Sequence, residues 1–222
     1  LPLFVPILEK YGIPEDFKYL PMIEGGLSND RSPRGAVGFW QLLPATAREL
    51  GLIVNNEVDE RYHPLRSTEA ACKYLLRAKD KFGTWTNAAA SYNMGMRGLA
   101  RRMEQQRVDD YYDLLLNEET SRYIFRIIAM KSIVEDPAKY GFEIPEDQLY
   151  VMEQLDSVEV TETISDLTAF AFDKGINYKI LKHYNPWLRS NSLTVNSRYP
   201  SFMITIPRKH RQAQQREIDI SD

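Results

Sequence analysis

The sequence holds a single cysteine, Cys72, so no disulfide can form within the chain. This cysteine lies in the stretch TEAACKYLLRAKDKF beside apolar residues, which is typical of a small buried side chain rather than of a nucleophile. The three histidines, His63, His183 and His210, are scattered and form no pair with metal-ligand spacing. We therefore expect neither a metal centre nor a cofactor.

Long apolar runs and a strong charge of one sign are also missing. No stretch reaches the roughly 20 apolar residues that a membrane helix needs. A net charge of −3 gives no basic face for nucleic acid. The GxxG of NMGMRG follows no strand pattern, which excludes a phosphate loop. The sequence starts at Leu1 without a signal-peptide pattern, so we expect a processed region whose targeting segment has been removed.

The 222 residues, 43% of them hydrophobic, suffice for one medium domain and one small domain. Helical periodicity and turn signals predict a mainly α domain over 1–143. Pro137, Gly141 and Pro145 then break the pattern and indicate a linker. Beyond it, LDSVEV and SFMITIP read as strands around two short helices, SDLTAFAFDKG and NYKILKHYN. This order predicts a small α+β (βααβ) domain over 150–207, followed by a flexible tail over 208–222.

One carboxylate differs from the others in its setting. Glu24 ends the apolar run YLPMIEGG at the C-terminal end of a predicted helix, where unpaired carbonyls make the local potential negative. Nearby Phe39 and Trp40 can remove water from it, and both effects raise a carboxyl pKa. A glutamic acid protonated near neutrality can act as a general acid. On these residues alone, a surface glutamate at a helix end is the more common alternative.

Four sequence blocks between Leu8 and Ile133 carry a resemblance to a known family, and they stand in the order expected for that family. They are YLPMIEGGLSNDRSPRGAVGFWQLLPATARELGL, DERYHPLRSTEAACKYLLRAKDKFGTW, AAASYNMG and EETSRYIFRIIA. The set resembles the family 1 lytic transglycosylases, with their SLT-type, goose-lysozyme-like domain, and within them the membrane-bound type D enzymes. The resemblance implies a lysozyme-like helical catalytic domain in which Glu24 is the sole catalytic acid/base. Asp30, the other acid of the first block, lies in a polar loop and matches no motif.

The resemblance also implies substrate-binding roles for side chains from three blocks, namely Ser32, Gln41, Tyr92, Asn93, Glu119 and Tyr123. Hydroxyl and amide groups can hold sugar and N-acetyl oxygens, and an aromatic ring can cover a sugar face. Simpler structural explanations exist for most of them. Tyr92 can be a core residue, Gln41 can face solvent, Ser32 and Asn93 can serve turns or caps, and Glu119 can be a first-turn acid.

Two departures from the family pattern bear on function. Gly25 follows Glu24 where the family has serine, so a hydroxyl beside the acid is lost and the rate is in question. In the second domain, ISDLTAFAFDKGINYKILKHYNPWL and the final SFMITIP resemble a LysM module, the small peptidoglycan-binding domain. The usual Gly-Asp-Thr-Leu start is replaced by TETISDL. The module either binds glycan or only braces the first domain.

The function implied by the resemblance is cleavage of the MurNAc-β-1,4-GlcNAc bond of peptidoglycan without water, which leaves 1,6-anhydroMurNAc ends. The alternatives are a goose-type lysozyme hydrolase and a catalytically impaired peptidoglycan-binding protein. The implied partners are peptidoglycan glycan strands and no nucleic acid. The implied location is the cell envelope, in the periplasm, with an outer-membrane anchor through the removed N-terminal segment left open. The sequence does not set the oligomeric state.

Overall fold

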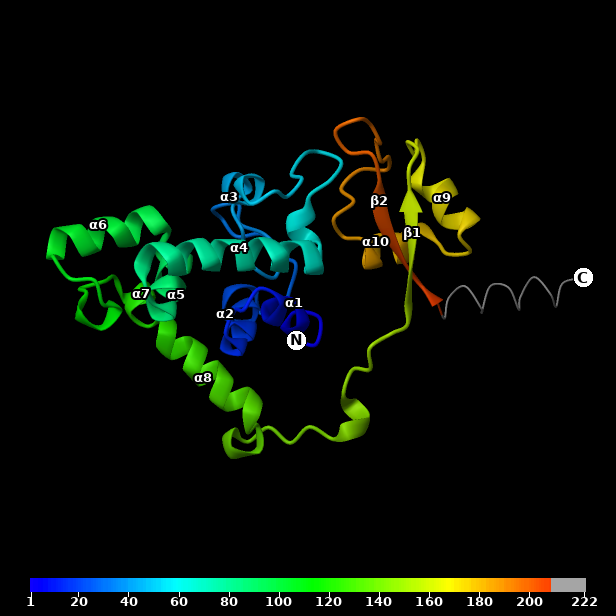
Figure 1. Cartoon of the computed structure of the whole chain (residues 1–222). Coiled ribbons are helices and arrows are strands. Elements are labelled where there is room, and N and C mark those ends of the chain that lie inside the picture. Colours follow the sequence, from blue (N-terminus) through cyan, green and yellow to red (C-terminus); the bar gives the residue numbers. More distant parts are fainter. Residues whose placement is uncertain (209–222) are drawn as a thin grey trace, which may run out of the picture. The chain divides into compact units, whose positions relative to one another are not determined.

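The computed structural model describes residues 1–208, apart from the side chain of Glu146. Beyond Arg208, the predicted flexible tail 208–222 lies outside the described residues. The chain divides into two compact units, drawn in Figure 1. The first contains Leu1–Leu52 and Pro64–Glu143, and the second contains Ile53–His63 and the residues from Ile144 onward.

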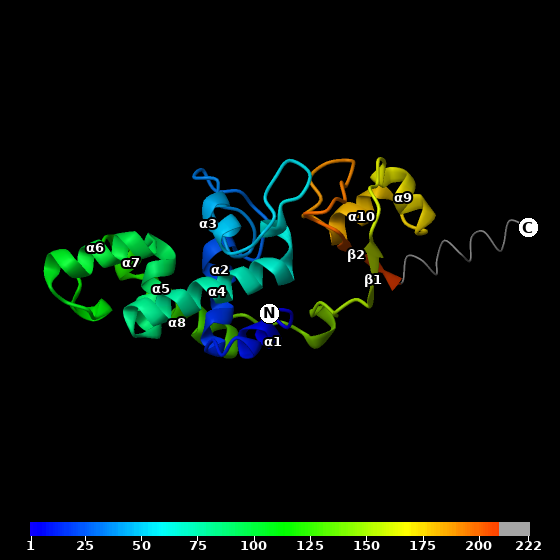
Figure 2. The same ribbon diagram turned by 45° about the horizontal axis from the view of Figure 1, so that its top comes forward.

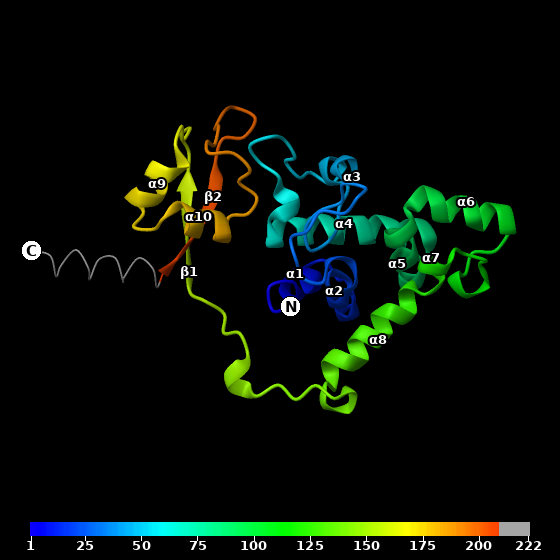
Figure 3. The same ribbon diagram turned by 180° about the vertical axis from the view of Figure 1, so that it is seen from behind.

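The first unit is helical, as the sequence predicts. Its α-helices are α1 (Val5–Lys10), α2 (Leu20–Gly25), α3 (Pro44–Glu49), α4 (Pro64–Phe82), α5 (Trp85–Met94), α6 (Met96–Gln106), α7 (Glu118–Ser121) and α8 (Tyr123–Glu135). Short 3-10 turns cover Glu15–Tyr19, Tyr111–Asp113 and Ala138–Tyr140. The long helix α4 runs through the middle of the unit, with α1 and α2 on one side and α3 on the other (Figure 1, Figure 3).

Local sequence signals set the helix ends that matter for the site. Pro21 stands in the first turn of α2, where its missing N–H costs nothing, and Gly26 ends the helix with a φ of 57°. Gly83, with a φ of 79°, follows the end of α4 in the same way. The Thr84 side chain then caps α5 by accepting a hydrogen bond of 3.1 Å from the Asn87 backbone N–H. These signals set the C-terminal end of α2 and the N-terminal start of α5.

Large apolar side chains fill the core of the first unit. Its fully buried members include Leu8, Tyr19, Leu20, Trp40, Leu75, Leu99 and Tyr123. Cys72 is buried among them on α4, and this burial raises the pKa of its thiol to about 12, as expected for a packing residue. None of the helices in residues 1–208 combines the length and the apolar character required to cross a bilayer.

The second unit confirms the predicted βααβ order. It contains β1 (Leu155–Val160), α9 (Leu167–Asp173), α10 (Tyr178–Tyr184) and β2 (Phe202–Pro207), with a 3-10 turn at Glu146–Gln148. The strands pair antiparallel, with Leu155 opposite Pro207 and Val160 opposite Phe202. Helix α10 packs against β2 and α9, and Figure 2 shows both helices beside the strands. The fold class is therefore mainly α with a small α+β domain, as predicted.

Residues 53–63 belong to the second unit, although the predicted boundaries of 1–143 and 150–207 assign them to the first. Val58 is 2% exposed within a core that also contains Leu188 and Ile204. The Glu57 carboxylate accepts hydrogen bonds from the Ser192 hydroxyl at 2.7 Å and the Thr194 backbone N–H at 3.2 Å. The second unit thus includes a segment that lies between α3 and α4 in the sequence.

Residues 53–63 are expected to stabilise the second unit, and this can be tested. Val58→Ala should lower the free energy of unfolding of the second unit by about 2 kcal/mol, because two buried methyl groups are lost and a cavity remains. Amide hydrogen exchange should show weaker protection in β1 and β2. Asn56→Ala, at an exposed position of the same segment, is the matched control. Loss of protection in α4 and α5 alone would assign the segment to the first unit instead.

Candidate functional site

Glu24 lies in the last turn of α2, directly before Gly25 and the left-handed Gly26. Its side chain is half-buried. The hydroxyl of Tyr123, at the start of α8, donates a hydrogen bond to Oε1 of this carboxyl group. Within residues 1–208, the Glu24 side chain makes no other hydrogen bond, so its Oε2 atom has no partner among these residues. One oxygen is held in place, and the other is available to a ligand.

The electrostatic setting keeps Glu24 protonated to a higher pH than a free glutamic acid. Burial raises the pKa of Glu24 above its ordinary value. The hydrogen bond from Tyr123 and the positive charge of Arg126 lower that pKa, while the negative charge of Glu119 raises it. Burial outweighs the two lowering effects, so the raised pKa expected from the sequence is confirmed. A carboxyl group in this state can give a proton to a leaving oxygen.

Tyr92 belongs to an aromatic wall near Glu24. Its hydroxyl donates a hydrogen bond of 2.7 Å to the backbone carbonyl of Trp40. Its ring meets the rings of Tyr74 and Trp40 edge-on, at centroid distances of 5.2 and 6.5 Å. Burial raises the pKa of Tyr92 well above its ordinary value, and the charge of Glu24 adds to this rise. Tyr92 is therefore a neutral ring close enough to sense the candidate acid.

Gln41 and Ser32 hold the loop that follows α2. The Gln41 side chain donates to the backbone carbonyls of Asp30 and Gly38 at 3.1 and 3.0 Å. The Ser32 hydroxyl accepts a hydrogen bond of 3.0 Å from the Ala36 backbone N–H. Both side chains stabilise the loop backbone. For Ser32 this is the turn-stabilising role that the sequence also allowed. Their substrate-binding roles stay predictions.

Asn93 and Glu119 meet across the junction between α5 and α7. The Asn93 amide donates a hydrogen bond of 3.0 Å to Glu119 Oε1. The hydroxyl of Thr120, which sequence reasoning missed, donates to the Asn93 side-chain carbonyl at 2.7 Å. Glu119 is exposed, and its charge reaches Glu24. The structure therefore brings Glu24, Tyr92, Asn93, Glu119 and Tyr123 into one neighbourhood.

Arg126 is a second residue that the motifs did not indicate. Its guanidinium donates a hydrogen bond of 3.0 Å to the carbonyl of Ile23 and lowers the pKa of Glu24. Arg126 also lines an open cavity of about 500 Å³ together with Asn117, Glu118, Glu119 and Arg122. The sequence could have indicated Arg126 by its spacing from Tyr123, because residues three positions apart on a helix lie on the same face.

Gly25 allows the loop after α2 to approach the helix closely. A Cβ atom at this position would lie 3.3 Å from the Gly38 carbonyl oxygen and 3.5 Å from Nε2 of Gln41. A serine here would require the loop to shift by a few tenths of an ångström. Glycine at this position therefore fits the close approach of the loop to the last turn of α2.

Comparison with known proteins identifies families that match parts of both units. The family described as "Transglycosylase SLT domain" matches residues 7–114. The family described as "Soluble lytic transglycosylase C-terminal LysM-like domain" matches residues 156–210. The chain therefore carries an SLT domain followed by a LysM-like domain. Within this SLT-domain chain, the first match contains Glu24, the loop after α2 and the Tyr92–Asn93 pair, and the second contains the βααβ unit.

Relatives of this SLT-domain chain extend the comparison. Membrane-bound lytic murein transglycosylase D of Escherichia coli, in strains K12 and O6:H1, is 26% identical over 212 residues, which cover 91% of this chain and 45% of the relative. The chain thus spans less than half the length of these relatives. The crystal structure of the 70 kDa soluble lytic transglycosylase of Escherichia coli aligns with 59% of this chain and 23% of its own, with a TM-score of 0.50 and 20% identity. That likeness concerns the fold.

The contact between Tyr123 and Glu24 predicts the direction of a pKa change. Tyr123→Phe removes a hydrogen bond that favours the carboxylate, so the pKa of Glu24 should rise further. Arg126→Gln should raise it as well, because a positive charge is lost. A pH titration of the Glu24 carboxyl carbon by NMR measures both changes.

Two matched variants control this titration. Tyr112→Phe removes the hydroxyl of an exposed tyrosine, and Arg122→Gln removes a charge from a residue whose ion-pair partner is Glu118. Both should leave the Glu24 titration where it is. A pKa of Glu24 that stays the same or falls in Tyr123→Phe would contradict the role given to this hydrogen bond.

Proposed function

We propose that this chain cleaves the MurNAc-β-1,4-GlcNAc bond of peptidoglycan without water, with Glu24 as the sole acid/base. The observation that carries the proposal is the Glu24 carboxyl group itself. It is half-buried, its pKa is raised, Tyr123 holds one of its oxygens, and its other oxygen has no partner among the described residues. Such a group can first give a proton and then take one back.

The reaction balances with one protein carboxyl group. Protonated Glu24 gives its proton to the glycosidic oxygen as the bond from C1 of MurNAc to that oxygen breaks. The N-acetyl carbonyl of the same sugar stabilises the positive charge that develops at C1. The sugar's C6 hydroxyl then attacks C1, and its proton passes to the Glu24 carboxylate. The products are a free GlcNAc end and a 1,6-anhydroMurNAc end, and Glu24 is protonated again.

An intramolecular attack suits this site because the nucleophile is already attached to the substrate. The entropy cost of bringing a second molecule to C1 is largely avoided. The aromatic wall of Tyr92 and Trp40 helps to keep water from competing with the C6 hydroxyl. No second carboxylate is needed to position a water molecule. Peptidoglycan strands are thus the proposed substrate, and the cell envelope is the proposed location.

Glu119 supports the alternative of a hydrolase. This second carboxylate is exposed and lies close enough to raise the pKa of Glu24. A water molecule held between two carboxyl groups is the arrangement used by inverting glycosidases. Glu119 is engaged by the Asn93 amide, which favours a structural or substrate-binding role. The third candidate, an impaired peptidoglycan-binding protein, is motivated by Gly25 in place of the family's serine.

The first prediction concerns Glu24→Gln. The variant should keep its fold and lose at least ~10²-fold in turnover on purified sacculi, which is the usual scale for general acid–base catalysis. Glu104→Gln, the same substitution at an exposed position of α6, should retain parental turnover. Near-parental turnover of Glu24→Gln would exclude Glu24 as the acid/base.

The second prediction concerns the products. Muropeptides should end in 1,6-anhydroMurNAc, lighter by the mass of one water than hydrolytic products, and borohydride should fail to reduce them. Mass spectrometry before and after borohydride treatment measures this. Mainly reducible MurNAc ends would make water the acceptor and establish the hydrolase, whereas no cleavage at all would leave the binding protein.

The third prediction concerns the LysM-like unit, which we propose to add affinity for glycan strands. Inactive Glu24→Gln protein should co-sediment with sacculi more completely than the same variant cut after Glu143. The cut also removes the core around Val58. The full-length Val58→Ala variant therefore serves as the control for loss of packing. Equal sedimentation of the cut and full-length proteins would make the unit a brace.

A further inference from the structure

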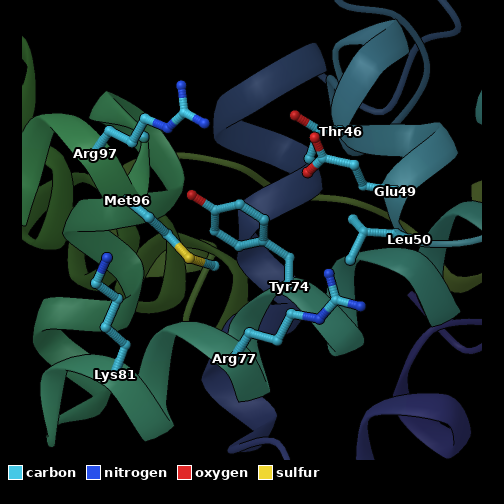
Figure 4. Close-up of a pocket in the computed structure, with 9 residues that line it drawn as sticks. Thr46, Glu49, Leu50, Tyr74, Arg77, Lys81, Met96 and Arg97 are labelled. Carbon is cyan, nitrogen blue, oxygen red and sulfur yellow. The ribbon is translucent and has the colours of Figure 1, made fainter.

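A cavity of about 490 Å³ lies between α3, α4 and α6 of the first unit. Figure 4 shows Glu49 and Leu50 on one side of it, Met96 and Arg97 on the other, and the Tyr74 ring between them. Its volume is within the range of small-molecule sites. The motifs of the family do not account for its charged lining.

The lining carries an excess of positive charge. Arg77 and Lys81 come from α4 and Arg97 from α6, while Glu49 is the single carboxylate, which leaves two positive charges uncompensated. Within residues 1–208, the side chains of Arg77, Arg97 and Glu49 make no hydrogen bond or ion pair. Arg77 and Lys81 stand four residues apart on one helix face, where like charges destabilise the helix. Lys81 lies in the last turn of α4, where a positive charge is favourable. Arg77 and Arg97 are exposed and available to an anionic ligand.

The cavity adjoins the candidate acid through two tyrosines. The Tyr74 hydroxyl donates a hydrogen bond of 2.7 Å to the Ser91 carbonyl, which fixes its ring in the cavity wall. That ring meets the Tyr92 ring edge-on at 5.2 Å, and Tyr92 senses the charge of Glu24. The two tyrosines therefore connect the lining of the cationic cavity with the candidate acid.

We propose that this cavity binds the carboxylate groups of the peptide stems on the glycan strand. The proposal rests on peptidoglycan being the substrate. The stems are short peptides carried by MurNAc, and their free carboxylates are the anions that such a strand offers. A guanidinium group binds a carboxylate through two parallel hydrogen bonds. A carboxylate is therefore a better ligand for Arg77 and Arg97 than a neutral sugar is. Lys81 adds charge without that geometry.

A binding experiment tests the cavity without any turnover. A free stem peptide with carboxylate ends is titrated against the full-length protein, followed by NMR, and compared with the same peptide in amidated form. The double variant Arg77→Gln/Arg97→Gln should bind the carboxylate form at least tenfold more weakly. Glu49→Gln should bind it more tightly, because a repelling charge is lost. Arg101→Gln, exposed on α6 outside the cavity, controls for the loss of one positive charge from the same helix.

The outcomes of this titration are decisive. Weaker binding of the amidated peptide together with the two opposite shifts supports the proposal. Equal binding of the two peptide forms, or parental affinity in the double variant, overturns it. Thermal unfolding of each variant shows whether a loss reflects the fold instead.

A turnover experiment separates the cavity from the chemistry. The double variant should lose at least tenfold in kcat/KM on sacculi with intact stems and keep parental turnover on glycan strands stripped of their peptides. An equal loss on both substrates would overturn the proposal. If the parental protein cleaves neither substrate, the proposed function fails, while the peptide titration still decides whether the cavity binds carboxylates.

Discussion

The hydrogen bond from Tyr123 to Glu24 joins two helices whose contacting residues are 99 positions apart in the chain. Partial exclusion of water raises the pKa of a carboxyl group, yet a buried polar group without a partner is costly. Tyr123 supplies a partner to one oxygen and leaves the other without one among the described residues. Arg126, on the same helix, binds the carbonyl of Ile23, so α8 holds the last turn of α2 at two points.

The surroundings of Glu24 are arranged by backbone contacts as much as by side chains. Gly25 leaves room for the following loop where a Cβ atom would crowd the Gly38 carbonyl, and Gln41 braces that loop through two carbonyls. Tyr92 is anchored on the carbonyl of Trp40. A wall of neutral aromatic rings thus stands between the candidate acid and the cationic cavity. Proton transfer and the proposed binding of stem carboxylates can proceed side by side without sharing charged groups.

Because residues 53–63 belong to the second unit, the chain passes between the two units three times instead of once. The chain enters the second unit after α3, contributes Val58 and Glu57 to it, and returns to begin α4. It leaves again after Glu143. The SLT family match over residues 7–114 contains this segment, so part of the matched region is folded with the C-terminal unit.

Local sequence signals determined the helices, the two strands and the position of Glu24 at a helix end, because caps, glycines and hydrophobic periodicity act over a few residues. The motifs also indicated Tyr123 as a partner of the site. Only the tertiary structure decided that Tyr123 is the donor to Glu24, that Arg126 opposes its raised pKa, and that residues 53–63 join the second core. These outcomes depend on which side chains meet after folding, and neither periodicity nor spacing specifies a contact between residues far apart in the chain.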